Sequence, residues 1–224
     1  MQISEGANSA LYRQVTAAGI PVTHACEVGV YMPDTSNVLG WINGAVRTTL
    51  VECDPAIVAV LHDRFAQHAH VRIEGVAVAD APGTLTLYRT GASTFGANVP
   101  VAPALANDGY TRSSADAFTV PAVTFDTIDD GSVDVLSIDV EGGEWFVLRH
   151  LRSRPQVICV ETHGKRYVNP FLTEIDEWMR SQGYGAWYRD ACDTVYRKGW
   201  TTAPMDLAPA PSWWQRVKRA VRGY

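Results

Sequence analysis

The sequence predicts an α/β fold, a three-layer sandwich in which helices cover both faces of a mostly parallel sheet. Buried apolar runs alternate with helical patterns along most of the chain, which is typical of a parallel sheet packed between helices. Acidic residues stand at the ends of several of these runs, where ligands bind in such sheets. The 224 residues are 46% hydrophobic and 19% charged, as in globular proteins. We expect one domain at residues 1–204, with its core at 22–199, and a basic amphipathic tail at 205–224.

The first half of the chain predicts helices and strands in alternation. Asp54 and Pro55 mark a helix start, because aspartate caps helix N-termini and proline suits the first helical position. Apolar residues then keep helical spacing from Ile57 to Phe65. We expect helices at 11–18, in a short segment closed near Gly44, and from residue 55 onward. The expected strands are 22–28, 48–53 and 71–78.

The second half continues the alternation after a turn at 80–83, Asp-Ala-Pro-Gly, which separates two strands. Residues 91–118 show no sustained period and are rich in small and polar residues, which indicates a long functional loop. Further strands are expected at 84–88, 133–139, 157–161, 184–188 and 194–198, and further helices at 143–151 and 170–182.

Charge and cysteine usage exclude several classes of protein. A net charge of −5 argues against a nucleic-acid partner. No apolar stretch reaches the roughly 18 residues that a membrane span needs. We expect no signal peptide, because residues 1–10 lack a basic region followed by an apolar run. The four cysteines contain no C-x-x-C pair, and free cysteine behaves as a small buried apolar residue. We therefore expect a reduced, cytoplasmic protein.

Four acidic residues end or follow predicted strands: Glu27, Glu52, Asp80 and Asp139. Each alone fits a helix cap or a solvated turn, but their shared position indicates a ligand site. Glu52 follows Glu27 by 25 positions, which suits a carboxylate that binds ribose hydroxyls. Residues 27–33 contain a single glycine, Gly29, where a dinucleotide site needs three. A cofactor without a pyrophosphate fits better, and S-adenosylmethionine is the candidate.

The densest acidic cluster lies at residues 139–145, Asp-Val-Glu-Gly-Gly-Glu-Trp. The preference of helix N-termini for negative charge explains one or two of these acids, but not Asp139 directly on a buried strand. The next strand ends at Glu161, and we expect it and His163 to lie beside Asp139 across the sheet. Such groups serve as a general base or as metal ligands. The alternative is a hydrogen-bonded pair that fixes the loop.

The chain resembles the FkbM-type S-adenosylmethionine-dependent methyltransferases. Residues 138–148, I-D-V-E-G-G-E-W-F-V-L, resemble the family signature I-D-x-E-G-x-E-x-x-V-L. Residues 27–33, E-V-G-V-Y-M-P, differ from the usual D-x-G-A-N-x-G. Shorter matches occur in the family's order at 51–55, 77–80 with Gly83 and 87–88, 92–94, 125–128 and 159–163, and together cover about 22–198.

This resemblance implies a class I methyltransferase fold, a Rossmann-like sheet of seven strands that ends in an antiparallel hairpin. It implies methyl transfer to an oxygen of a sugar, glycan, glycolipid or secondary metabolite. The 91–118 loop would fold over the acceptor, with Ser93 and Phe95 near the donor. The cofactor site would comprise Glu27, Gly29, Tyr31, Glu52, Cys53, Asp80 and Ser93.

The same resemblance places four residues on the acceptor side: Asp139, Glu141, Glu161 and His163. The catalytic candidates among them are Asp139, Glu141 and His163. His163 or Asp139 could remove the hydroxyl proton. Alternatively, Mg²⁺ bound by Asp139, Glu141 and Glu161 could lower the hydroxyl's pKa. The sequence does not decide between base and metal.

Two alternative functions and several possible partners follow from the sequence. An NAD(P)- or nucleotide-sugar-binding oxidoreductase is disfavoured by the missing glycines, and an inactive binding module by the intact acidic cluster. Residues 212–222 predict a basic helix with two tryptophans, which suits an anionic membrane surface. Packing of this helix on the protein itself or on a second copy is the alternative, so a homo-oligomer is a further expectation.

Overall fold

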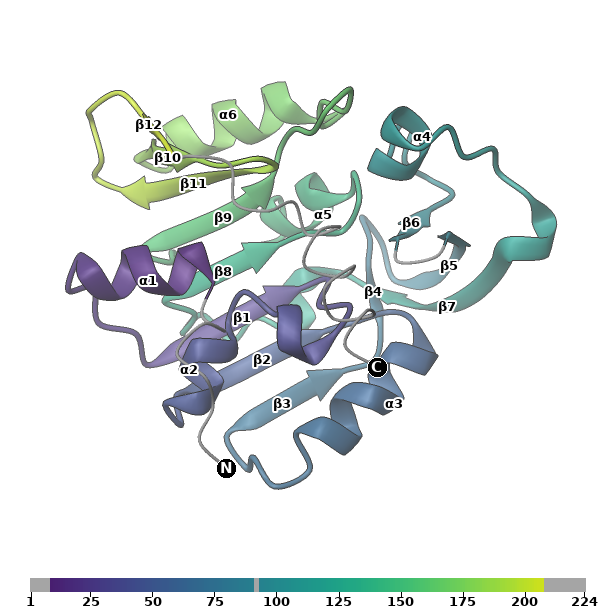
Figure 1. Cartoon of the computed structure of the whole chain (residues 1–224), viewed down its shortest axis with the longest axis horizontal. Coiled ribbons are helices and arrows are strands. Elements are labelled where there is room, and N and C mark those ends of the chain that lie inside the picture. The colour runs from purple at the N-terminus through teal and green to yellow at the C-terminus, as the bar shows by residue number, and fades with distance from the viewer. Residues whose placement is uncertain (1–8, 91–92, 208–224) are drawn as a thin grey trace.

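The computed structural model describes residues 9–90 and 93–207 and contains two β-sheets (Figure 1). The main sheet has the strand order β12-β10-β11-β9-β8-β1-β2-β3. All neighbouring pairs are parallel except those that β11 forms with β9 and β10. The strands are β1 His24–Val28, β2 Arg47–Val51, β3 Val71–Glu74, β8 Val135–Ile138, β9 Val157–Glu161, β10 Tyr184–Arg189, β11 Asp193–Lys198 and β12 Met205–Asp206.

This arrangement confirms the predicted class I methyltransferase sheet with its reversed final hairpin. The difference is β12, a two-residue strand that adds an eighth member at the edge. The predicted domain boundary at 204 therefore falls before the last strand of the sheet. Leu207, which follows β12, donates its backbone N–H to Arg189 O at 2.8 Å and packs against the core.

Helices cover both faces of the main sheet. Buried side chains of α1 Ala10–Ala17, α2 Leu39–Asn43 and α3 Pro55–Arg64 form one apolar cluster with the strands. Those of α5 Glu144–Leu148 and α6 Leu172–Ser181 form another. As predicted, Asp54 caps α3, because its Oδ1 accepts the N–H of Ala56 at 2.9 Å. Short 3₁₀ turns occupy η1 Pro33–Thr35, η2 Ser114–Asp116 and η3 Phe125–Thr127.

The second sheet was not expected from the sequence. Its order is β4-β7-β5-β6, with β4 Ala77–Val78, β5 Gly83–Thr90, β6 Ser93–Gly96 and β7 Ala117–Val123. The single strand predicted at 71–78 is divided between β3 in one sheet and β4 in the other. The loop predicted at 91–118 is wrong as well, because its described part contains β6, the helix α4 Pro103–Asn107 and the start of β7. In Figure 1 this sheet lies where the arrowheads of β1 and β8 point.

The expected helix at 212–222 and its membrane contact lie outside the described residues. Over 9–90 and 93–207, no helix has the length and apolar character to cross a membrane. The four cysteines are free thiols, two of them buried and two half-buried.

Candidate active site

A cavity of about 330 Å³ lies at the carboxyl ends of β1 and β8. These two strands are neighbours, whereas the chain leaves β1 toward β2 on the other side. Strand order therefore reverses at this point, which is the usual ligand position in an open α/β sheet. The cavity walls come from the loops after β1, β2 and β8, from the second sheet, and from the turn between β10 and β11.

Glu52, the residue after β2, holds two of these loops together. Its Oε2 accepts the backbone N–H groups of Val30 at 3.2 Å and Tyr31 at 3.0 Å, and its Oε1 accepts those of Cys53 at 2.7 Å and Asp54 at 2.8 Å. A carboxylate has about four lone-pair positions, and backbone donors occupy all of them. Glu52 therefore shapes the cavity wall, while its bond to ribose hydroxyls stays a prediction.

Glu27, the acid near the end of β1, holds the loop that follows η1. Its Oε1 accepts the N–H of Asn37 at 2.8 Å, and its Oε2 accepts the hydroxyl of Ser36. Burial raises the pKa of this carboxyl to about 7, and the negative charge of Asp139 adds to the shift. Of the predicted cofactor residues, Glu27, Gly29, Tyr31, Glu52 and Cys53 line the cavity.

Asp54 and Arg89 join the two sheets at the cavity wall. The guanidinium of Arg89, on β5, donates through Nε to Asp54 Oδ2 at 2.6 Å and through Nη2 to Oδ1 at 2.7 Å. Asp54 is buried, while the Arg89 side chain is about half exposed. The sequence identified Asp54 only as a helix cap and did not single out Arg89.

The cavity is strongly acidic. Among the lining residues in the described part of the chain, Arg89 is the one Lys or Arg, against seven acids, of which Glu27 and Glu141 have raised pKa values. An excess of one sign of charge in a cleft attracts ligands of the opposite sign. The site therefore favours a cationic ligand over a pyrophosphate. The seven acids are Glu27, Glu52, Asp54, Asp139, Glu141, Asp190 and Asp193.

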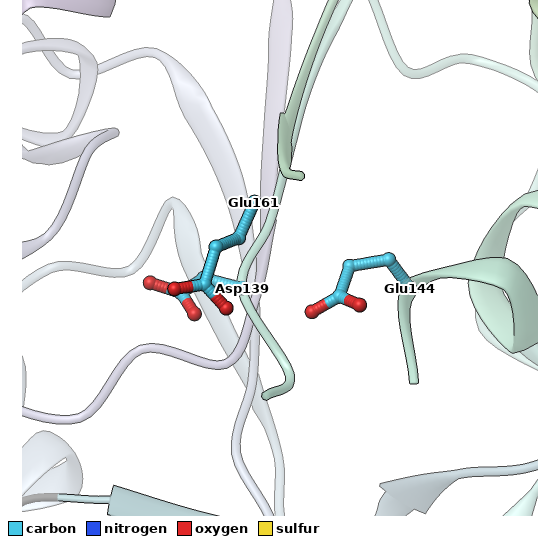
Figure 2. A group of neighbouring side chains, drawn as sticks. All are labelled: Asp139, Glu144 and Glu161. Atoms are coloured by element: carbon cyan, nitrogen blue, oxygen red, sulfur yellow. The ribbon is translucent and has the colours of Figure 1, made fainter. Parts of the chain in front are cut away.

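Three carboxylates converge beside the cavity (Figure 2). Asp139 follows β8, Glu161 ends β9, and Glu144 begins α5; one oxygen of each lies within 4.8 Å of the other two. The structure thus brings Asp139 and Glu161 together as predicted. Glu144 takes the position that the sequence analysis gave to Glu141, which is not in this group.

Glu141 lines the cavity with a buried and strained geometry. Its φ is +59°, a conformation that few non-glycine residues adopt and that is often found at functional sites. Its Oε2 is buried without a hydrogen-bond partner in the described structure. Burial and the charge of Asp139 raise its pKa well above the ordinary value.

Besides Glu161, which belongs to the group beside the cavity, three predicted site residues do not line it. The half-exposed Asp80 pairs with Arg149 at 2.7 Å and His150 at 3.2 Å. The ring nitrogens of His163 contact Thr162 Oγ1 at 2.9 Å and the Asp190 carbonyl at 3.0 Å. Ser93 is buried on β6, next to the lining residue Thr94. Asp80 and His163 thus bond neighbouring protein groups, and their roles toward a ligand stay predictions.

The sheet order, with its reversed final hairpin, is that of the class I methyltransferase fold. The chain belongs to the methyltransferase FkbM domain family, whose model matches residues 27–185. That range contains Glu27, Glu52 and the whole acidic cluster around Asp139. Membership of this family favours methyl transfer over the NAD(P)- or nucleotide-sugar oxidoreductase.

Several solved structures are similar to this chain. A predicted O-methyltransferase from Agrobacterium tumefaciens is 12% identical over 84% of this chain and 79% of that chain, with a TM-score of 0.43. Precorrin-6y C5,15-methyltransferase from Geobacter metallireducens is 12% identical over 90% and 94%, with a TM-score of 0.42. A glycopeptide N-methyltransferase is 8% identical over 88% and 92%, with a TM-score of 0.43. No curated protein sequence matches this chain.

Proposed function

We propose that this methyltransferase moves a methyl group from S-adenosylmethionine to a hydroxyl of a sugar, a glycan or glycolipid, or a secondary metabolite. The observation that supports the donor is the excess of carboxylates around the cavity at the ends of β1 and β8. S-adenosylmethionine carries a sulfonium and an ammonium group, so an acidic cavity attracts it. The same charge repels the pyrophosphate of NAD(P) or of a nucleotide sugar.

The residues on the β1 and β2 side fit such a donor. Gly29, Tyr31 and Cys53 line the cavity and would contact it, while Glu52 holds their loops in place. A β-carbon on Gly29 would lie 1.7 Å from the Asp139 carbonyl oxygen, so only glycine permits this wall. When bound, S-adenosylmethionine supplies an activated methyl group.

On the acceptor side, Glu141 is the proposed general base. Its buried Oε2 lacks a hydrogen-bond partner among the described residues, and a hydroxyl in the cavity would donate to it. Accepting that proton makes the hydroxyl oxygen more nucleophilic. A Mg²⁺ ion that polarises the hydroxyl is the second route, and it requires carboxylate ligands at the edge of the cavity.

Calorimetric titration of the full chain tests the donor. We expect saturable binding of S-adenosylmethionine and none of NAD⁺. Asp139→Asn, which removes a charge from the cavity, should weaken the binding of S-adenosylmethionine. The matched change Asp80→Asn outside the cavity should leave it unaltered. Binding of NAD⁺ alone would refute the proposal.

A second assay tests the transfer step. With a radiolabelled methyl donor, we expect label to enter hydroxyl-bearing acceptors from a panel of sugars, glycolipids and polyketides. Binding of the donor without label in any acceptor would favour the inactive binding module.

A further inference from the structure

The group formed by Asp139, Glu144 and Glu161 lies beside the cavity and contains more carboxylates than the proposed base requires. One oxygen of each lies within 4.8 Å of the others. Figure 2 shows Glu144 extending from α5 toward the carboxylates of Asp139 and Glu161, which lie next to each other at the strand ends. Glu144 and Glu161 are almost completely buried, whereas Asp139 also lines the cavity. Two members of the group therefore lie in the protein interior, and the third lies at the wall of the ligand cavity.

Glu144 is held in a fixed position inside this group. Its Oε1 accepts the backbone N–H groups of Val140 at 3.0 Å and Gly142 at 3.1 Å, and its Oε2 accepts a side-chain N–H of Asn169. Asn169 also donates to the Glu161 carbonyl oxygen at 3.1 Å. Hydrogen bonds of this kind orient the ligands of metal ions.

Two polar atoms in and beside the group have no partner in the part of the chain that the structure describes. Oε2 of Glu161 is buried and accepts no hydrogen bond, in a side chain that is 2% exposed. The hydroxyl of Tyr167 is also buried and unbonded, in a residue that is 1% exposed. Buried polar groups are nearly always satisfied, and buried carboxylates are paired or coordinate metals. No Lys or Arg within the described ranges forms an ion pair with Glu144 or Glu161.

We propose that Asp139, Glu144 and Glu161 bind a hard divalent cation, Mg²⁺ or Mn²⁺. Carboxylate oxygens are the ligands that these ions prefer. A cation would neutralise the buried charge and give the unbonded oxygen of Glu161 a partner. Because Asp139 also lines the cavity, the ion would lie next to a bound hydroxyl. Its part in methyl transfer rests on the proposed function, but its binding does not.

Titration of the full chain with Mn²⁺, followed by electron paramagnetic resonance of the free ion, tests the site without any substrate. After removal of metals with EDTA, we expect one saturable site that Mg²⁺ displaces. Glu161→Gln and Glu144→Gln should each weaken Mn²⁺ binding at least ~10-fold, since even outer partners of metal ligands have effects of this size. Glu141→Gln is the control, because Glu141 is also a buried acid but lies outside the group; it should lose much less affinity than the other two variants.

The absence of saturable binding to the wild-type chain would overturn the proposal, whatever the variants do. Equal losses in Glu161→Gln and Glu141→Gln would also overturn it, because they would indicate general attraction to an acidic cavity. Calorimetry of the metal-free chain with S-adenosylmethionine separates this outcome from the proposed function. Donor binding without Mn²⁺ binding refutes only the metal site, and Mn²⁺ binding without donor binding refutes only the donor.

Discussion

Gly29 and the carbonyl oxygen of Asp139 approach so closely that a β-carbon on the glycine would lie 1.7 Å from this oxygen. The loop after β1 therefore rests directly on the end of β8, at the reversal of strand order. Gly29 also has a φ of +83°, which residues other than glycine rarely adopt. One residue thus brings together the donor wall and the acidic cluster.

Gly29→Ala should destabilise the protein by roughly 3–5 kcal/mol, from backbone strain and overpacking together. Gly131→Ala is the matched control, because its φ is +88° and nothing lies within 4 Å of an added β-carbon. That variant should lose only the strain, about 1–2 kcal/mol. Urea denaturation measures both free energies of unfolding. Equal losses would show that contact with Asp139 is unimportant.

Replacing Glu52 should weaken binding of S-adenosylmethionine. Glu52→Gln offers one acceptor oxygen in place of two, so two of the four backbone N–H groups lose their partner, and the loops of the donor wall loosen. We expect a loss of about 1–3 kcal/mol in binding free energy, typical of hydrogen bonds to charged groups. Calorimetry measures it. Glu74→Gln on β3, where the side chain pairs with Arg72, should bind normally; an equal loss there would contradict this role.

Glu27 should make stability depend on pH. Its pKa is raised from 4.5 to about 7 in the folded protein, so the folded state binds more protons between these values. This contribution is present below pH 4.5 and is lost as pH rises through 7. The shift corresponds to about 2–3 kcal/mol between pH 5 and 8.

Glu27→Gln removes this dependence. Wild type should therefore lose about 2–3 kcal/mol of unfolding free energy relative to Glu27→Gln when the pH rises from 5 to 8. The comparison cancels the other buried acids, Glu141, Glu144 and Glu161, because both proteins contain them. Asp139, which faces Glu27, is also unchanged. If the free energy of unfolding of Glu27→Gln differs from that of wild type by the same amount at pH 5 and pH 8, the raised pKa of Glu27 is refuted.

Much of the main sheet could be predicted because its signals are local. The apolar run at β9 has the predicted bounds, and Asp54 with Pro55 marks the start of α3. The second sheet had no such signal. It depends on the pairing of β5 with β7, a strand about thirty residues further along the chain, which no local pattern indicates. In addition, Pro121 lies within β7, and a proline argues against a strand.

The candidate site was predictable where residues end neighbouring parallel strands, as Asp139 and Glu161 do. Glu144 was missed because an acid at a helix N-terminus has an ordinary explanation. His163 does not line the cavity: the chain leaves the sheet after Glu161, and His163 forms a bridge with Val168. The left-handed backbone of Glu141 has no signature in the sequence.

The Asp54–Arg89 pair should contribute measurable coupling between the sheets. Its bidentate geometry and the burial of Asp54 predict about 1 kcal/mol in a double-mutant cycle with Asp54→Asn and Arg89→Gln, the upper end for pairs with an exposed partner. Asp34 and Arg64, 3.6 Å apart and exposed, provide a control cycle with a coupling near zero. Urea denaturation measures both cycles; equal couplings would contradict a bridging role.

Glu141 and His163 should differ sharply in their effect on methyl transfer. Glu141 lines the cavity and keeps an unbonded oxygen within the described structure, so Glu141→Gln should lower kcat by ~10²-fold or more, as loss of a general base does, with little change in KM. His163 does not line the cavity, and its ring bonds Thr162 and the Asp190 carbonyl. His163→Ala should therefore keep kcat within a few-fold and lose about 1–2 kcal/mol of stability with its two hydrogen bonds. Steady-state kinetics with an acceptor from the panel, beside urea denaturation, measure both; a ~10²-fold loss of kcat in a fully stable His163→Ala would transfer the role of base to the histidine.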